Sequence, residues 1–154
     1  MMKNSRRDLL ATSLKLAALM AGAGLLPREA MAAWTQAAFE AKTMAEAMKA
    51  LGGTTLAQSA EVTITGPDIA ENGAVVPVGM STGMAGVKRM ALLVEKNPNT
   101  LAAVFDVSDA VEANFNTRVK MGQSSNVFAV ALMNDGRVLY AQKEIKVTLG
   151  GCGG

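Results

Sequence analysis

The stretch from Thr54 to Leu149 is rich in β-branched residues that alternate with polar ones, and this pattern limits the fold more than any other feature of the chain. In residues 115–121, apolar or threonine side chains at odd positions alternate with Asn, Arg and Lys at even positions. Successive side chains of a strand point to opposite faces, so this alternation predicts a half-buried strand. Turn residues separate the runs, with Gly-Pro-Asp at 66–68, Asn-Pro-Asn at 97–99 and Asn-Asp-Gly at 134–136. Short strands joined by such turns are typical of an antiparallel β-sandwich.

About seven strands are predicted in this region. They cover residues 61–65, 75–80, 87–96, 101–107, 115–121, 127–133 and 138–149. Residues 91–94 (Ala-Leu-Leu-Val) are uniformly apolar, which predicts burial on both faces of that strand. Pro77 has no backbone N–H to donate, so its strand is predicted to lie at the edge of a sheet.

A helical periodicity precedes the strands. From Trp34 to Leu51, apolar residues recur at intervals of three and four, which predicts one amphipathic helix. Gly52 and Gly53 are expected to end it. We expect this helix to cover one face of a sheet. The predicted fold class is therefore mainly β, an antiparallel sandwich with one N-terminal helix.

The first 32 residues have the pattern of an export signal. Arg6 and Arg7 precede a long apolar stretch, and a small-x-small site predicts cleavage between Ala32 and Ala33. The paired arginines indicate the twin-arginine route and hence a periplasmic protein. A membrane anchor is the alternative, but Lys15 within the apolar stretch and the cleavage site both argue against it.

Removal of the signal leaves a domain over residues 33–149 and a glycine-rich arm over residues 150–154. The signal holds five of the 15 basic residues and two of the 13 acidic ones, so the mature chain has a net charge near −1. No basic patch points to nucleic acid. The chain has no histidine and one cysteine, which excludes a His-ligated metal, an internal disulfide and a cysteine-held iron–sulfur cluster.

The single cysteine, Cys152, is surrounded by Gly150, Gly151, Gly153 and Gly154 at the C-terminus. Glycine leaves the backbone free and chain ends are usually mobile, so we predict a flexible arm with one exposed thiol. A catalytic residue needs rigid surroundings, so this thiol suits a carrier better, and no catalytic residue is assigned. An unpaired cysteine in an oxidising compartment implies a working thiol or an intermolecular disulfide.

Two internal segments add to this pattern: residues 70–78 (Ala-Glu-Asn-Gly-Ala-Val-Val-Pro-Val) and residues 94–98 (Val-Glu-Lys-Asn-Pro). Together with the leader, the strand set and the terminal Gly-Gly-Cys-Gly-Gly, they resemble the SoxY family, the sulfur-carrier subunits of the bacterial thiosulfate-oxidising system. The resemblance extends over the whole mature chain, and the terminal pentapeptide is its most specific part.

The resemblance implies an immunoglobulin-like sandwich with substrate attached covalently at Cys152. It implies a haem-containing enzyme that joins thiosulfate to this cysteine and a hydrolase that releases sulfate. A sulfane dehydrogenase, where present, would oxidise the remaining sulfur. It also implies a stable complex with a second small β-sandwich subunit, SoxZ. We expect no cofactor in the chain itself, and neither nucleic acid nor a membrane among its partners.

Two other functions remain open at this point. The chain could be an assembly subunit that uses Cys152 only for an intermolecular disulfide. It could also be a thiocarboxylate carrier, since some sulfur-transfer proteins end in Gly-Gly, but the export signal argues against this because that activation needs cytoplasmic ATP.

Two further groups of residues are interpreted as structural. Methionines four residues apart could suggest copper binding, but methionine more often fills a core. Three carboxylates close together in the sequence are typical of a solvated loop. The methionines are Met44, Met48, Met80 and Met84, and the carboxylates are those of Asp106, Asp109 and Glu112.

Overall fold

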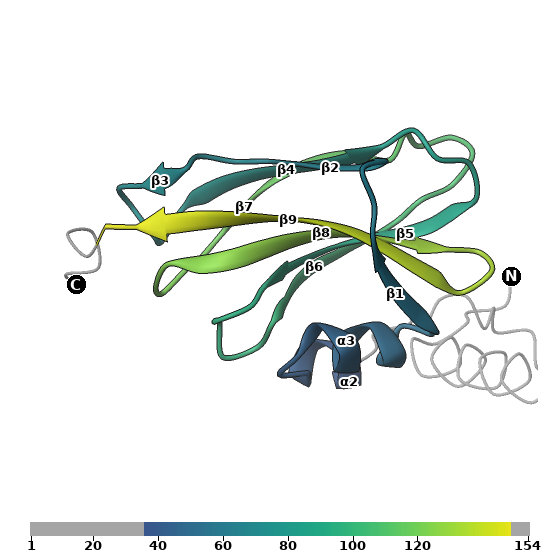
Figure 1. Ribbon diagram of the computed structural model, residues 1–154, viewed down its shortest axis with the longest axis horizontal. Coiled ribbons are helices and arrows are strands. Elements are labelled where there is room, and N and C mark those ends of the chain that lie inside the picture. The colour runs from purple at the N-terminus through teal and green to yellow at the C-terminus, as the bar shows by residue number, and fades with distance from the viewer. Residues whose placement is uncertain (1–35, 149–154) are drawn as a thin grey trace, which may run out of the picture. The chain divides into compact units, whose positions relative to one another are not determined.

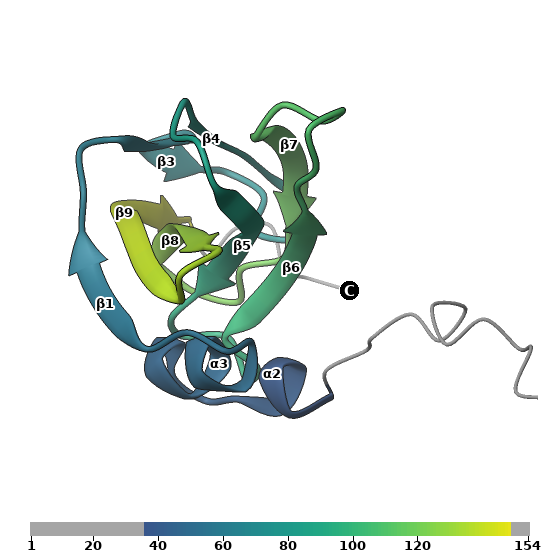
Figure 2. The ribbon, with the colours of Figure 1, turned by 90° about the vertical axis from the view of Figure 1, so that its right-hand side faces the viewer.

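Two β-sheets and a helical layer are stacked on one another (Figures 1 and 2). The structure, a computed structural model, describes residues 36–148. The predicted signal with Arg6 and Arg7, its cleavage site and the predicted arm with Cys152 lie outside these residues. Within residues 36–148, none of the helices is both long enough and apolar enough to cross a bilayer.

The described elements are two helices and nine strands. The helices are α2 (Gln36–Glu40) and α3 (Met44–Ala50). The strands are β1 (Thr55–Gln58), β2 (Val62–Thr65), β3 (Ile69–Ala70), β4 (Val76–Thr82), β5 (Val87–Val94), β6 (Leu101–Asp106), β7 (Asn114–Val119), β8 (Ser125–Met133) and β9 (Arg137–Val147).

The strands form a larger sheet of order β1-β9-β8-β5-β6, in which β3 also pairs with β9, and a smaller sheet of order β2-β4-β7. The seven predicted strands correspond to β2 and β4–β9, and all of these pair antiparallel, which confirms the predicted sandwich. The sequence pattern missed β1 and β3, which both lie parallel to β9. The four residues of β1 are all exposed and β3 has two residues, so neither shows alternation. The larger sheet is therefore mixed.

The larger sheet is buried on both faces. Leu92 and Val94 of β5 belong to the core between the two sheets, whereas Ala91 and Leu93 belong to a second core beneath the helices. All four side chains are at most 2% exposed, which confirms the burial on both faces predicted for residues 91–94. The helices also cover this sheet as expected, because Ala47 and Met48 of α3 pack into the second core.

The single helix predicted over residues 34–51 is wrong in one respect, since the described part is broken into α2 and α3. The break lies at Thr43, which has an extended backbone and caps α3. Its Oγ1 accepts a hydrogen bond from the Glu46 N–H at 3.2 Å, and the Glu46 carboxylate accepts one from the Lys42 N–H at 3.0 Å. The first bond is the N-cap bond that the Thr-x-x-Glu spacing encodes, whereas the second reaches back to the N–H of the residue before the cap.

The helical layer is fastened to the turn between β5 and β6. Thr100 is 2% exposed, and its hydroxyl donates a hydrogen bond to the Lys42 carbonyl at 2.7 Å. The Lys42 ammonium donates in return to the Pro98 carbonyl and to the Asn99 side chain, each at 2.8 Å. These bonds hold the start of α3 against one end of the larger sheet.

The strand that contains Pro77 is not an edge strand, so that prediction is wrong. β4 is the central strand of the smaller sheet, between β2 and β7. The pairing of β2 with β4 begins at Gly79, and Pro77 lies beyond it, opposite Arg118 of β7 alone. The missing N–H of Pro77 therefore removes no bond from the β2–β4 ladder.

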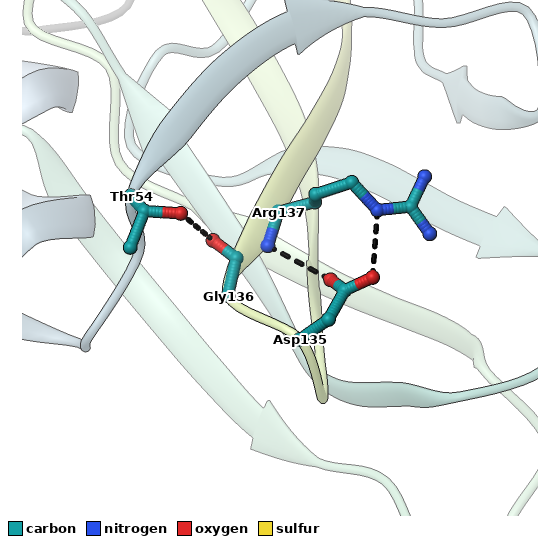
Figure 3. Close-up of polar contacts among 4 residues, drawn as sticks. All are labelled: Thr54, Asp135, Gly136 and Arg137. Carbon is teal, nitrogen blue, oxygen red and sulfur yellow. Dashed lines mark hydrogen bonds and ion pairs between the residues drawn. The ribbon is translucent and has the colours of Figure 1, made fainter.

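The hairpin between β8 and β9 confirms the turn predicted at residues 134–136 (Figure 3). Gly136 has a φ of +87°, which glycine adopts without strain. Asp135 accepts a hydrogen bond from the Arg137 N–H at 3.0 Å and pairs with its guanidinium at 2.7 Å. The backbone bond, followed by the side-chain bond, lowers the pKa of Asp135. The Gly136 carbonyl accepts bonds from the Thr54 N–H and hydroxyl, which anchors the chain entering β1.

The N-cap of α3 gives a first prediction. Replacing Thr43 with Ala should lower the free energy of unfolding by about 1 kcal/mol, because an N-cap acceptor is lost, whereas Thr43→Ser should retain most of the stability. Urea unfolding of the mature chain measures both. If the alanine variant is as stable as the parent protein, the cap does not stabilise the break between α2 and α3.

Candidate functional site

The candidate site is the end of the sandwich at which β9 finishes. Thr148 is the last described residue, and Cys152 follows it by four residues in the sequence. The structure therefore describes the base from which the predicted arm starts, and the thiol itself lies outside the described residues, as do Gly150, Gly151, Gly153 and Gly154. We call the residues that hold this end of β9 the arm base, namely 68–75, 120–125 and 146–148.

One side of the arm base is held by β3. Ala70 lies opposite Val147 in a parallel pair, and the Thr148 N–H donates to the Ala70 carbonyl at 3.1 Å. The Lys146 N–H donates to the Asp68 carbonyl at 3.0 Å. Figure 1 shows β3 beside the last part of β9. The bonds from Lys146 and Thr148 keep the chain paired up to the last described residue.

The other side of the arm base is held by the β7–β8 connection. The Val147 N–H points away from β3 and donates to the Ser124 hydroxyl at 2.9 Å. The end of β9 is therefore bonded on both edges. Ser124 was not predicted as a site residue, because nothing in the local sequence shows that its hydroxyl lies within reach of Val147.

Gly73 lies where the β3–β4 loop meets the β7–β8 connection. Its carbonyl accepts a hydrogen bond from the Met121 N–H at 2.7 Å. A Cβ atom on Gly73 would collide with the Met121 carbonyl oxygen and would lie 2.8 Å from Cγ1 of Val147. Asn72 shapes this loop by accepting a bond from the Ala74 N–H at 2.9 Å. Glycine is needed at residue 73 because the two loops and β9 approach one another too closely for a side chain.

The two internal segments that carry the family resemblance meet at this same end. Residues 70–78 run from the last residue of β3 through the loop with Gly73 into the start of β4. Residues 94–98 form the turn after β5, where the Asn97 side chain donates to the Lys120 carbonyl at 2.8 Å, one residue before Met121. The structure thus brings both segments to the arm base.

One ion pair reinforces the arm base. The Lys143 ammonium of β9 lies 2.8 Å from the Asp68 carboxylate, and this hydrogen bond and charge lower the pKa of Asp68. A depressed carboxyl pKa stabilises the folded protein above the ordinary carboxyl pKa, and this contribution is lost as the pH falls through the lowered value. Asp68 is 90% exposed, so solvent screening keeps the contribution small.

The methionines and carboxylates singled out in the sequence lie elsewhere. Met48 and Met80 are both buried, but in the two different cores on opposite faces of the larger sheet, which confirms their interpretation as core residues. Asp106 pairs with Arg89 at 2.6 Å, while Asp109 and Glu112 are exposed. These two line an open hollow of about 770 Å³ at the opposite end from the arm base. Among residues 36–148, no three His, Cys, Asp or Glu side chains gather closely enough to hold a metal ion.

This arrangement defines a class of protein, a β-sandwich whose only cysteine follows the firmly held last strand in the sequence. The family profile described as "Sulfur oxidation protein SoxY" matches residues 47–152, a match that includes Cys152. The chain belongs to the SoxY family of sulfur oxidation proteins.

One solved structure agrees with this family assignment, and another shares the fold. The sulfur carrier protein SoxY from Chlorobium limicola f thiosulfatophilum is 30% identical, with a TM-score of 0.63 over 70% of this chain and 97% of that chain. A variant of the superoxide reductase (neelaredoxin) from Ignicoccus hospitalis is 19% identical, with a TM-score of 0.53 over 60% of this chain and 94% of that chain, a likeness of fold alone. A comparison with curated protein sequences gives no significant match.

The close approach at Gly73 gives a second prediction. Gly73→Ala should lower the free energy of unfolding by about 1–3 kcal/mol, because the new methyl group must displace backbone. Hydrogen exchange at Val147 and Thr148 should also accelerate. Gly122→Ala is the matched control, because a Cβ there has no atom within 4 Å. Equal stability and exchange in the two variants would contradict the role assigned to Gly73.

Proposed function

We propose that this chain is a non-catalytic carrier that binds sulfur intermediates covalently through the thiol of Cys152. The observation that carries the proposal is the family match over residues 47–152, which reaches the only cysteine in the chain. The similarity to a solved sulfur carrier protein supports the same role. The arm base supports it structurally, because a carrier needs a fixed point from which its reactive group is presented.

The proposed loading step forms a bond between the Cys152 sulfur and the outer sulfur of thiosulfate. The thiol loses its proton, and the two electrons released pass to a haem-containing enzyme. Water then attacks the terminal sulfone sulfur in a hydrolase, the sulfur–sulfur bond to that group breaks, sulfate leaves and a persulfide remains on Cys152. A sulfane dehydrogenase, where present, oxidises this remaining sulfur.

The sequence around Cys152 favours a carrier that is activated by its enzymes. A thiolate is the attacking species, and nearby cations favour its formation. From Val147 to Gly154 the chain has no cationic side chain, and the nearest in sequence is that of Lys146. Activation would therefore come from the pocket of the partner enzyme. Between visits the thiol would stay mostly protonated, and this low reactivity protects it from stray oxidation.

The proposed arm also has a suitable length. Four residue steps separate Thr148 from Cys152, which gives a reach of roughly 13–14 Å when extended. Glycines on both sides of the cysteine keep the chain narrow enough to enter a channel. Fixing each residue in such a channel costs about 1–2 kcal/mol of conformational entropy, so docking would be transient, as visits to several enzymes require.

We further propose that the carrier works in the periplasm as a heterodimer with a SoxZ-like subunit. Assembly before export explains the twin-arginine signal, since that route is generally used by proteins that are already folded and this chain has no evident ligands for a cofactor. Pro77 cannot mark the dimer surface, because β4 lies inside the smaller sheet. The partner subunit would therefore bind at another part of the sandwich.

The third prediction tests the attachment site. Cys152→Ser should abolish loading of thiosulfate while leaving the melting temperature unchanged, because the residue lies beyond β9. The intact mass of protein purified without reductant should show sulfur adducts in the parent and none in the variant. Retained loading would end the carrier proposal, and a clean doubled mass in the parent would favour a subunit that uses Cys152 only for a disulfide.

The fourth prediction tests export. Replacing Arg6 and Arg7 with lysine should keep the protein in the cytoplasm, where it should be recovered as a heterodimer with the partner subunit. Cell fractionation followed by gel filtration measures both. Recovery as a folded monomer, with the partner subunit reaching the periplasm by itself, would contradict assembly before export.

A further inference from the structure

Two exposed apolar side chains lie at the arm base. Ile69 is 58% exposed and Val75 is 50% exposed, the two highest values among the large exposed hydrophobic residues of the described chain. The other two are Leu56 on β1 and Val111 in the loop between β6 and β7, at 41% and 44%. Neither Ile69 nor Val75 belongs to one of the two cores.

Both residues belong to the segment that holds the end of β9. Ile69 lies opposite Lys146 in the parallel pair of β3 and β9. Val75 closes the loop after β3 through a bond from its N–H to the Asn72 carbonyl at 3.3 Å, immediately before β4 begins. Ile69 and Val75 are therefore fixed to the same loop that bonds Thr148, and we call them the apolar pair.

The short arm limits how far an enzyme can stand from this pair. Four residue steps from Thr148 give Cys152 a reach of roughly 13–14 Å even when fully extended. A catalytic centre recessed within a pocket uses up most of this length. The rim of the pocket must then lie against the residues that surround Thr148, and among these the apolar pair offers the surface that gains most from leaving water.

We propose that the apolar pair is the docking contact for the enzyme that joins thiosulfate to Cys152, with the pair covered by apolar side chains on the rim of its pocket. This inference rests on the proposed function and extends it from the thiol to the body of the carrier. The contact brings the enzyme rim against the arm base and leaves the whole arm free to enter the pocket. Half-exposed side chains of this size suit a transient contact, because they add affinity without a large permanent interface.

The test uses the full mature carrier with its partner subunit, the thiosulfate-ligating enzyme and thiosulfate. The double variant Ile69→Thr/Val75→Thr keeps β-branched side chains and should fold normally, as a melting curve checks. We expect its KM as a substrate of the enzyme to rise roughly tenfold with kcat unchanged, because apolar area is lost from the contact. Val111→Thr, a similarly exposed valine at the opposite end of the sandwich, is the control and should leave KM unchanged.

Other outcomes overturn the inference. An unchanged KM in the double variant, or an equal rise in Val111→Thr, would show that the pair has no special contact with the enzyme. If the double variant no longer forms the heterodimer, the pair contacts the partner subunit and not the enzyme. If Cys152 of the double variant reacts faster with a small maleimide, the pair contacts residues 149–154 of the chain itself. Loading that survives Cys152→Ser would instead refute the proposed function, so the two failures are distinguishable.

Discussion

The pairing of β9 on both of its edges is the constraint on which the rest of this structure depends. β8 pairs with β9 along most of its length, and β1 and β3 occupy the beginning and the end of the other edge. A slip of one residue in this pairing would turn every side chain of β9 to the opposite face. It would also change the chain left between the sandwich and Cys152 by one residue, about 3.3 Å. The folding of the sheet and the reach of the proposed arm are thus set by the same register.

Much of the fold could be predicted because burial leaves a periodic trace in the sequence. The alternation in residues 115–121, the apolar run at 91–94 and the Asn-Asp-Gly hairpin all correspond to features of the structure. β1 and β3 left no trace, since all four residues of β1 are exposed and β3 has only two residues. The Thr-x-x-Glu spacing at Thr43 is a sequence signal for the start of a helix. The apolar periodicity continues across it, however, and therefore predicted one helix instead of two. Pro77 led to a wrong prediction of an edge strand. Whether this proline lies beyond the end of β2 depends on the register of β2 and β4, which the sequence does not show.

The candidate site also has one part that the sequence predicts and one part that it does not. Cys152 stands out from the sequence alone, because it is the only thiol and glycines surround it. The arm base could not be predicted, because its contacts join residues far apart in the chain, such as Gly73 with Met121 and Ser124 with Val147. The Asn-Gly pair at residues 72–73 was a local signal for a turn, but it does not reveal that a second loop lies against it.

The parallel pairing of β1 and β3 with β9 has a consequence for folding during synthesis on the ribosome. Both strands pair only with β9, the last strand to be made. While β9 is still inside the exit tunnel, β1 and β3 have no partner, and the second core lacks Val138 of β9. Completion of the larger sheet therefore waits until β9 has emerged, and non-local pairing of this kind slows folding. The proposed N-terminal export signal emerges well before the body is complete, so a transport route that waits for a finished fold suits this order of events.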